Sequence, residues 1–350
     1  MRKNGVVGSD KLVLGVDVGG TKVAVGAVWG REATEIVEHP TDTSGSEPLL
    51  DGIEAGVREL TAKVGEPAAI GVGVPSQIEF ASGTVLTSVN IPLAGVPLRE
   101  VLGHRLGPRI YVDNDANCAA LAEAELLGVR NLVMLTLGTG VGGGIVIDGR
   151  IFRGTHGLGA ELGHVAIIAD GPPCPGNCPN RGCLEALCSG TALERDATEL
   201  GKGRPDTLLG RIYEEQRRVT GRNVVQAAEQ GDADARMLFE RLGTWLGTGI
   251  AGFVNVFEPE RVLIGGGVSR AAGLFLERAR EEAATRALPA LWERVTVELA
   301  QGGADAGVIG AGLLAAHEAE RDTAQVGAAS RGAEALAQRA PEHGPTEGAS

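Results

Sequence analysis

KLVLGVDVGGTKVAVGAVW, residues 11–29, consists of two apolar, β-branched runs joined by a turn at Gly19 and Gly20. Runs of this kind on either side of a tight glycine turn predict a β-hairpin. The stretch NLVMLTLGTGVGGGIVIDGRIF, residues 131–152, repeats the design of strand, glycine-rich turn and strand. Two hairpins of the same pattern indicate an internal duplication.

The second hairpin also contains a G-x-G-x-x-G pattern at Gly138, Gly140 and Gly143. A dinucleotide-binding fingerprint of this form requires a helix after the glycines. The residues that follow here, GIVIDG, are typical of a strand. The pattern therefore predicts another hairpin tip and not a strand-to-helix nucleotide loop.

Glycine tips suit phosphate because backbone N–H groups can approach it without a Cβ in the way, and Thr21 adds a hydroxyl donor. Asp17 would repel a polyphosphate unless Mg²⁺ or its water shell lay between them. A third glycine run, IGGG at residues 264–267, ends a predicted strand. Ordinary glycine turns are the alternative, but three such segments favour a nucleotide gripped between two lobes. The predicted phosphate-facing residues are Asp17, Gly19, Gly20, Thr21, Lys22, Gly138, Thr139, Gly140, Gly265, Gly266 and Gly267.

Further elements alternate between strand and helix, which predicts an α/β fold. We expect a buried strand at residues 68–75, a strand leading into a helix at 109–128, a helix at 235–259, a strand at 261–269 and a helix at 307–320. Beyond about Glu320 the chain has almost no large apolar side chains, and the first nine residues are similar. Both ends are therefore predicted to be disordered, since they cannot bury enough surface to offset their ordering entropy.

Composition narrows the classes of partner. The chain has 350 residues, 43% of them hydrophobic, and a formal net charge of −13. The acidic balance disfavours a nucleic-acid surface, because such binding depends on Lys and Arg neutralising phosphates. A leader peptide or membrane-spanning run is not evident, so we expect a cytoplasmic protein with small-molecule partners and no membrane association.

Asp115 lies where the strand RIYVD passes into a helix that begins near Ala116. A carboxylate at a helix N-terminus is favoured in its ionised form and is exposed to whatever lies beyond the strand end. It could orient an attacking hydroxyl and accept its proton. A plain helix N-cap is the alternative, and from this residue alone the commoner one.

Four of the five cysteines lie between Cys174 and Cys188. An odd cysteine count without a secretory signal favours metal ligation over a disulfide framework. One imidazole and three thiolates, from His164, Cys174, Cys178 and Cys183, would make a closed tetrahedral zinc site of structural type. Cys188 suits an apolar helix interior, but it is the substitute ligand if one of the others does not reach the metal.

Five motifs appear in order along residues 10–318: GVDVGGTK, the DND at 113–115, LGTGVGGG, the ELGH at 161–164 and the NRGCLE at 180–185. Together they resemble the ROK family of sugar kinases and repressors. The resemblance implies the two-lobed actin, Hsp70 and sugar kinase fold, with a duplicated RNase H-like core and an interlobe cleft. The small lobe would comprise 10–118 plus 304–318, the large lobe 119–303 with a zinc loop at 164–188, and 1–9 and 319–350 would be disordered.

The resemblance also implies roles. Asp115 would be the catalytic base, and the sugar contacts would be Ser76, Asn90, Asn114, Glu161, His164 and Glu185. The implied activity is ATP-dependent phosphorylation of a hexose at the 6-hydroxyl, with glucose first and fructose, mannose and N-acetylmannosamine as alternatives. ATP, Mg²⁺ and a structural Zn²⁺ would be the cofactors, with ADP or polyphosphate as alternative donors, and the assembly a homodimer or higher homo-oligomer.

Two features depart from the family pattern. Cys174 and Cys178 have C-x₃-C spacing followed by Pro179, where the family usually has C-x-C-G, so the loop path should differ. GVPSQIEF, around Ser76, replaces the more usual G-x-P-G-P near the sugar. A non-catalytic ROK sugar-sensing regulator is the remaining alternative. A sugar-sensing protein that has lost catalysis is disfavoured by the intact Asp17, Asp115 and both glycine tips. A transcriptional repressor is disfavoured because ROK repressors carry a winged helix-turn-helix ahead of the kinase-like part, whereas about ten residues precede the first strand here.

Overall fold

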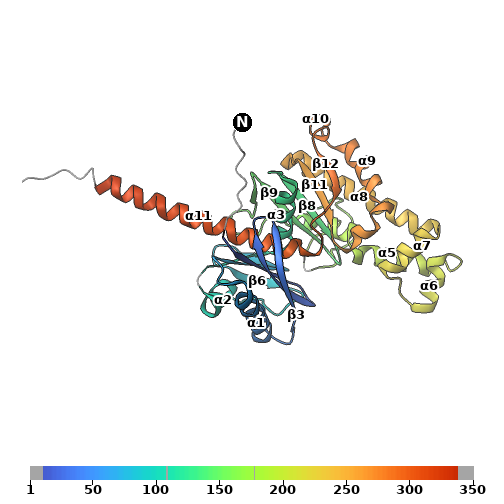
Figure 1. The fold of residues 1–350 in the computed structure, drawn as a ribbon. Helices are drawn as coiled ribbons and strands as arrows, with labels where there is room; N and C mark the ends of the chain where they lie inside the picture. The colour runs from blue at the N-terminus through green and yellow to red at the C-terminus, as the bar shows by residue number, and fades with distance from the viewer. Residues whose placement is uncertain (1–10, 108, 177, 338–350) are drawn as a thin grey trace, which may run out of the picture.

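The computed structural model describes residues 11–337 except 108 and 177 (Figure 1). Two five-stranded sheets form the body, with strand orders β3-β2-β1-β4-β7 and β10-β9-β8-β11-β12. In each sheet three antiparallel strands are followed by two parallel ones. The strands are β1 (Val13–Val18), β2 (Lys22–Trp29), β3 (Glu32–Pro40), β4 (Ile70–Val74), β7 (Ile110–Asn114), β8 (Leu132–Leu137), β9 (Val141–Ile147), β10 (Arg150–Ile151), β11 (Arg261–Gly265) and β12 (Thr296–Leu299). The matching orders confirm the predicted duplication.

Helices cover both faces of each sheet, so the central strands are apolar on both sides. Helix α3 (Asp115–Leu127) packs against the second sheet, and α11 (Ala306–Ala337) lies beside α3 against the first. The opposite face of the first sheet is covered by α1 (Ser46–Val64) and α2 (Leu98–Leu106). The opposite face of the second sheet is covered by α8 (Ala233–Phe257) and α9 (Leu276–Arg286).

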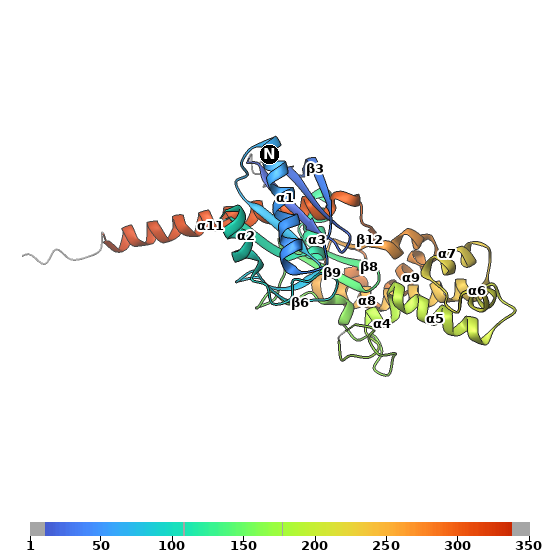
Figure 2. The same cartoon turned by 90° about the horizontal axis from the view of Figure 1, so that it is seen from below.

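Smaller elements extend this body. Strands β5 (Ser76–Glu79) and β6 (Thr84–Ser88) form a separate two-stranded sheet. Figure 2 shows α5, α6 and α7 at the end of the molecule opposite the projecting part of α11. The short elements are η1 (Leu162–His164), α4 (Leu184–Cys188), α5 (Gly190–Gly203), α6 (Leu208–Gln216), α7 (Gly221–Glu229), η2 (Gly267–Leu274), α10 (Pro289–Trp292) and η3 (Gly303–Asp305).

Two glycines allow α11 to lie directly on the first sheet. A Cβ at Gly15 of β1 would lie 1.9 Å from the carbonyl oxygen of Val308, and one at Gly71 of β4 would lie 1.8 Å from that of Ala311. Real Cβ atoms do not approach backbone this closely, so both positions require glycine. This packing brings the first turn of α11 to the end of β1, where Asp17 is located.

The C-terminal helix is longer than the sequence indicated. A disordered tail was predicted from residue 319, whereas α11 continues through Ala337 and projects from the body (Figure 1). The hydroxyl of Tyr111 in β7 donates to Asp322 at 2.6 Å, which ties the start of this extension to the first sheet. The segment is rich in Ala, which favours helix even where nothing is buried. The tail predictions for residues 1–9 and 338–350 lie outside the described residues.

The predicted lobe boundary at residue 118 falls inside α3, and the division remains a prediction. Within the described ranges, none of the helices combines the length and apolar character needed to cross a membrane.

Candidate active site

The junction of β7 and α3 holds the predicted base at the edge of the first sheet. Asn114 is the N-cap of α3: its side-chain oxygen accepts the N–H groups of Ala116 and Asn117 at 2.9 and 3.3 Å. Its side-chain amide donates to the carbonyl oxygen of Ser76 at 3.2 Å. The capping function therefore belongs to Asn114, and Asp115 is the first residue of the helix.

Backbone N–H groups at the start of α3 hold the side chain of Asp115. Its Oδ1 accepts the N–H of Ala116 at 2.9 Å. Burial raises the pKa of Asp115, and the hydrogen bond from Ala116 opposes the shift. A carboxylate with a raised pKa is a better proton acceptor than a solvated one.

A second carboxylate lies near it. Asp17 is the fifth residue of β1, and a Cβ at Gly307 in the first turn of α11 would lie 2.4 Å from its Oδ2. Burial raises the pKa of Asp17 to about 6, the charge of Asp115 adds to the increase, and Lys22 opposes it. This effect of Asp115 on Asp17 means that the end of β1 lies close to the N-terminus of α3.

The first glycine tip is closed by backbone contacts. The N–H of Gly19 donates to the carbonyl oxygen of Lys22 at 2.8 Å, and the hydroxyl of Thr41 donates to that of Gly19 at 2.7 Å. The N–H of Thr41 donates to the carbonyl oxygen of Thr21 at 3.0 Å. The ammonium group of Lys22 forms an ion pair with Glu38 on β3. Gly20 remains exposed at the tip.

The second glycine tip lies on the other side of α3. The N–H of Gly138 donates to the carbonyl oxygen of Gly140 at 2.9 Å. Behind the tip, β9 packs against the first turns of α3: a Cβ at Gly144 would lie 2.6 Å from the carbonyl oxygen of Ala116. Asp115 is therefore flanked by Asp17 of the first hairpin and by the second hairpin.

The third glycine segment adjoins the second tip. Gly266 has φ +84° and packs against the end of β8, where a Cβ would lie 2.4 Å from the carbonyl oxygen of Leu137. Gly265 ends β11 and Gly267 begins η2. The structure thus brings the second and third predicted phosphate segments together.

The N-terminus of α5 lies on the same tip, which the sequence did not indicate. The N–H of Gly190 donates to the carbonyl oxygen of Gly138 at 2.8 Å, and the hydroxyl of Thr191 donates to that of Thr139 at 2.8 Å. Ser189 caps the helix by accepting the N–H of Ala192. The SGT sequence after an apolar run is an N-cap signal, and it could have placed a helix start there.

The predicted sugar contacts Ser76, Glu161 and Asn90 lie near β5, η1 and the first glycine tip. Ser76 is buried, and its hydroxyl donates to Ser88 at 2.9 Å. The side-chain amide of Gln77, also absent from the prediction, donates to Glu161 at 3.0 Å. This contact joins the β5 strand to the segment before η1. A Cβ at Gly20 would lie 4.0 Å from the carbonyl oxygen of Asn90, which places Asn90 beside the first tip.

Glu185 sits between the second hairpin and the cysteine loop. One carboxylate oxygen accepts the N–H of Val141 at 2.9 Å, and the other accepts a hydrogen bond from the thiol of Cys174 at 3.3 Å. A Cβ at Gly140 would lie 2.4 Å from the carboxylate. The geometry of the phosphate tip therefore depends on the cysteine loop through this one side chain.

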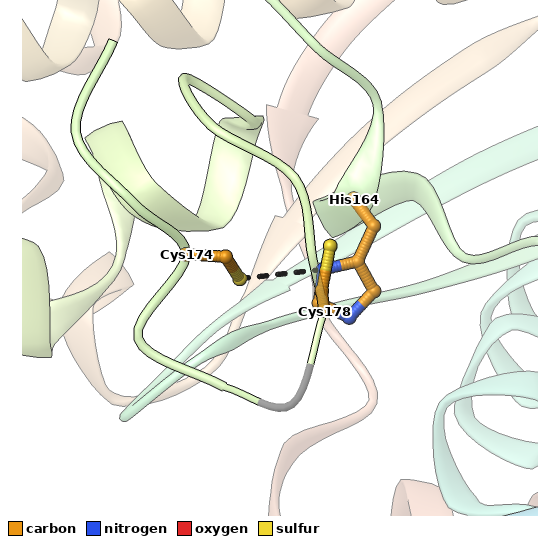
Figure 3. A group of neighbouring side chains, drawn as sticks. All are labelled: His164, Cys174 and Cys178. Carbon is orange, nitrogen blue, oxygen red and sulfur yellow. Dashed lines mark hydrogen bonds between the residues drawn. The ribbon is translucent and has the colours of Figure 1, made fainter.

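Three of the four predicted zinc ligands gather in one place (Figure 3). The ligand atoms of His164, Cys174 and Cys178 all lie within 4.8 Å of one another, and Cys174 Sγ is 3.7 Å from His164 Nδ1. Zn–S and Zn–N bonds of about 2.3 and 2.0–2.1 Å meeting at a tetrahedral angle place sulfur and nitrogen about 3.6 Å apart. The donor set and its spacing fit zinc.

The remaining cysteines separate into two kinds. Cys183 is buried outside that three-residue group, but its thiol interacts with the thiol of Cys174. Cys188 instead points into the core, where its thiol donates to the carbonyl oxygen of Leu242 at 3.7 Å. Cys188 as a substitute ligand is therefore wrong, because its helix α4 turns the side chain toward α8.

Comparison with known proteins identifies the family. The model of the ROK family matches residues 13–318. The chain belongs to the ROK family. A glucokinase of Halalkalibacterium halodurans is 36% identical over 318 residues, which cover 87% of this chain and 95% of that protein.

Two solved ROK structures are similar over their whole length. The ROK hexokinase from Thermus thermophilus is 35% identical with a TM-score of 0.77, covering 89% of this chain and 99% of the other. The ROK family glucokinase from Streptomyces griseus, solved in complex with glucose and AMPPNP, is 33% identical with a TM-score of 0.70, covering 87% and 98%. The predicted two-lobed α/β fold is confirmed.

In this ROK protein one further polar cluster adjoins the base and was absent from the prediction. Asp113, the first aspartate of the DND motif, accepts a hydrogen bond from Arg153 at 2.5 Å. The partners are 40 positions apart, Asp113 in β7 and Arg153 in the loop after β10, so local pattern offers no signal for the pair.

Proposed function

We propose that this ROK protein is a hexokinase-type sugar kinase that transfers the γ-phosphoryl group of ATP to the 6-hydroxyl of glucose. The observation that carries the proposal is the position of Asp115, which opens α3 between two glycine-tipped hairpins. The similarity to glucokinases over 95% of their length supports the same activity. The same similarity does not favour the alternative hexoses, fructose, mannose and N-acetylmannosamine.

Asp115 would accept the proton of the attacking hydroxyl. Its Oδ1 accepts the N–H of Ala116, and Oδ2 would face the sugar hydroxyl. Phosphoryl transfer has a loose transition state, so the base mainly orients the hydroxyl and takes its proton late. The raised pKa supports this role because a general base works best when its pKa lies near the operating pH.

The backbone N–H groups of the two glycine tips would hold the phosphates, and the N-terminus of α5 would add a positive helix end beside the second tip. Mg²⁺ bound to the phosphates would neutralise the charge on the transferred group, with Asp17 facing the ion or its water shell. Ser76, Asn90, Asn114, Glu161, His164 and Glu185 would line the sugar side, with Gln77 fixing Glu161.

His164, Cys174 and Cys178, with Cys183 as the fourth donor, would hold a structural Zn²⁺. Such an ion would stiffen the loop from which Glu185 reaches the second phosphate tip. Zinc and phosphate geometry would then be linked through Glu185 and Val141.

The test is turnover by the purified protein against a panel of hexoses with ATP, ADP or polyphosphate as donor. We expect ADP formation with ATP and glucose. Asp115→Asn should lower kcat by about 10²–10⁴-fold while hexose affinity, measured by calorimetry, stays within about tenfold, because the amide keeps the shape but cannot accept the proton. Asp206→Asn, an exposed aspartate far along the chain, should leave kcat unchanged.

Two results would contradict the proposal. Near-normal turnover by Asp115→Asn would assign the base to another residue. Hexose binding without phosphorylation by any donor would instead support the non-catalytic sugar-sensing alternative.

A further inference from the structure

A buried ion pair connects the loop after β10 to β7, the strand that immediately precedes the base. Arg153 follows β10, and its Nε donates to Oδ2 of Asp113 in β7 at 2.5 Å. Its Nη1 lies 3.1 Å from Glu318 of α11. The three side chains are 12%, 3% and 13% exposed. A cation at this depth contacts two elements, β7 and α11, that are remote from it in sequence.

The other oxygen of Asp113 organises the start of α3. Asp113 Oδ1 accepts the backbone N–H of Asn114 at 2.8 Å and the side-chain amide of Asn117 at 2.9 Å. These residues lie on either side of Asp115. Any movement of the Asp113 carboxylate is therefore passed to the helix turn that carries Asp115.

Arg153 is itself fixed from the side. Its guanidinium lies 3.7 Å from the centre of the Phe80 ring, between β5 and β6. The loop that follows Arg153 packs on the same segment, since a Cβ at Gly157 would lie 2.6 Å from the backbone nitrogen of Phe80. A planar cation between a carboxylate and an aromatic face has little freedom to shift.

We propose that Arg153 is a positioning residue for phosphoryl transfer, holding Asp115 in place through Asp113 and tying that position to the packing of the two sheets. The inference rests on the proposed function, because it takes Asp115 as the base. A buried charge that loses its partner is strongly unfavourable. The pair therefore has one stable arrangement, and it fixes the junction of β7 and α3.

The electrostatics of the pair offer a readout that a structural role would not move. Charged side chains near Asp115 include Asp17 of β1, Asp113 of β7 and Arg153. Glu318 of α11 and Arg99 of α2 both interact with Arg153, and Lys22 of β2 acts on Asp17. Asp17, Asp113, Asp115 and Arg153 all act on the buried thiol of Cys118, which places them in one neighbourhood. Removing Arg153 leaves the charge of Asp113 without its cation, and removing Asp113 leaves Arg153 paired, among the described residues, with Glu318 alone.

The two single variants should therefore shift the pKa of Asp115 in opposite directions. Arg153→Met leaves the negative charge of Asp113, which disfavours the ionised form of Asp115 and raises its pKa. Asp113→Asn leaves the positive charge of Arg153, which lowers it. Each shift should amount to about 0.5–1 pH unit in the acid limb of kcat/KM for the hexose. The double variant should return close to the wild-type limb.

The effect of Arg153 on the position of Asp115 is tested by measuring kcat in variants of Arg153. Arg153→Met should lower kcat by about 10–100-fold with hexose KM changed less than about threefold, because a misplaced base impairs the chemical step more than binding. Arg153→Lys keeps the charge but not the planar fork, so its acid limb should stay at the wild-type pH while kcat is restored only in part. Arg130→Met, at an exposed arginine paired with Asp148, is the matched control and should change neither.

The proposal is overturned if the acid limb of the kcat/KM profile stays at the wild-type pH in both single variants, or if both variants shift it in the same direction. If wild-type protein phosphorylates no hexose, the proposed function fails, and the ion pair is tested separately by NMR titration. In protein labelled at aspartate carboxyl carbons, with Asp115→Asn for assignment, opposite shifts of the pKa of Asp115 in the two variants support the electrostatic link. Unchanged titration overturns it.

Discussion

Replacing Asp17 by Asn should stabilise the protein at alkaline pH. Burial first, and then the charge of Asp115, raise the pKa of Asp17 from its ordinary value of 3.8 to about 6. That difference corresponds to about 3 kcal/mol. The first turn of α11, at Gly307, lies against the carboxylate, but a helix N-terminus contributes only about 0.3–1 kcal/mol. Desolvation therefore exceeds the helix contribution, and the ionised group is a net cost to the fold.

The sign follows from proton linkage. The folded protein binds this proton more tightly than the unfolded chain does, so the stability associated with Asp17 is fully present below pH 3.8. It is lost as the pH rises to about 6, and above that value the folded state bears a cost of up to about 3 kcal/mol. An amide has no charge to desolvate. Asp17→Asn should therefore gain stability relative to wild type as the pH rises from 4 to 6, and keep that gain above pH 6.

The assay is urea unfolding followed by circular dichroism at pH 4, 6 and 8, with EDTA present to exclude divalent cations. The free energy of unfolding of Asp17→Asn should exceed that of wild type by about 2–3 kcal/mol at pH 8 and differ by less than about 1 kcal/mol at pH 4. Asp206→Asn, at an exposed site, should show no pH-dependent difference. Turnover by Asp17→Asn should fall despite the added stability.

The reasoning is refuted by a difference that is the same at pH 4 and pH 8, or by an Asp17→Asn protein that is less stable than wild type at pH 8. Confirmation would identify Asp17 as a residue kept for its function at the expense of stability, which is the expected behaviour of a carboxylate that faces a bound cation.

Two other predictions concern the metal and the packing of α11. Metal analysis should find about one zinc per chain in the wild-type protein. Cys178→Ser should lose the zinc and Cys188→Ala should keep it. Equal zinc content in the two variants would mean that this cysteine cluster does not bind the metal. Gly71→Ala should lower the free energy of unfolding by about 3 kcal/mol or more, because the new Cβ would lie 1.8 Å from the carbonyl oxygen of Ala311. Gly52→Ala, in α1 with no atom within 4 Å of the new Cβ, should raise it by about 0.5–1 kcal/mol; destabilisation of equal size in both would mean that backbone contact is not the cause.

The parts of the fold that rest on short-range pattern could be predicted from the sequence. Both glycine hairpins, the strand before α3 and the start of α8 follow from apolar runs and turn residues within about 20 positions of one another. The length of α11 could not be obtained in this way. The prediction for residues 319–337 considered how much apolar surface the segment buries, whereas its helix depends on intrinsic propensity and on the contact of Asp322 with Tyr111.

The candidate site divides along the same line. Asp17, Asp115 and the glycine tips belong to motifs, and their chemistry is visible in a few consecutive residues. Arg153, Gln77 and Thr191 do not, because each acts through a partner at least 40 positions away. Arginine, glutamine and threonine are common on surfaces, so residue type alone cannot distinguish a side chain that makes a buried contact from one that is solvated.

The position of α11 explains why residues far from the motifs matter to the base. Its first turn lies against Asp17, and its Glu318 holds the far side of Arg153, which in turn holds Asp113. One rigid helix therefore contacts the neighbours of Asp115 on both sides. Gly15 and Gly71 fix that helix on the first sheet at backbone contact, so the place of its first turn beside Asp17 is set by glycine packing. The geometry of the proposed chemistry thus depends on a helix that carries none of the catalytic motifs.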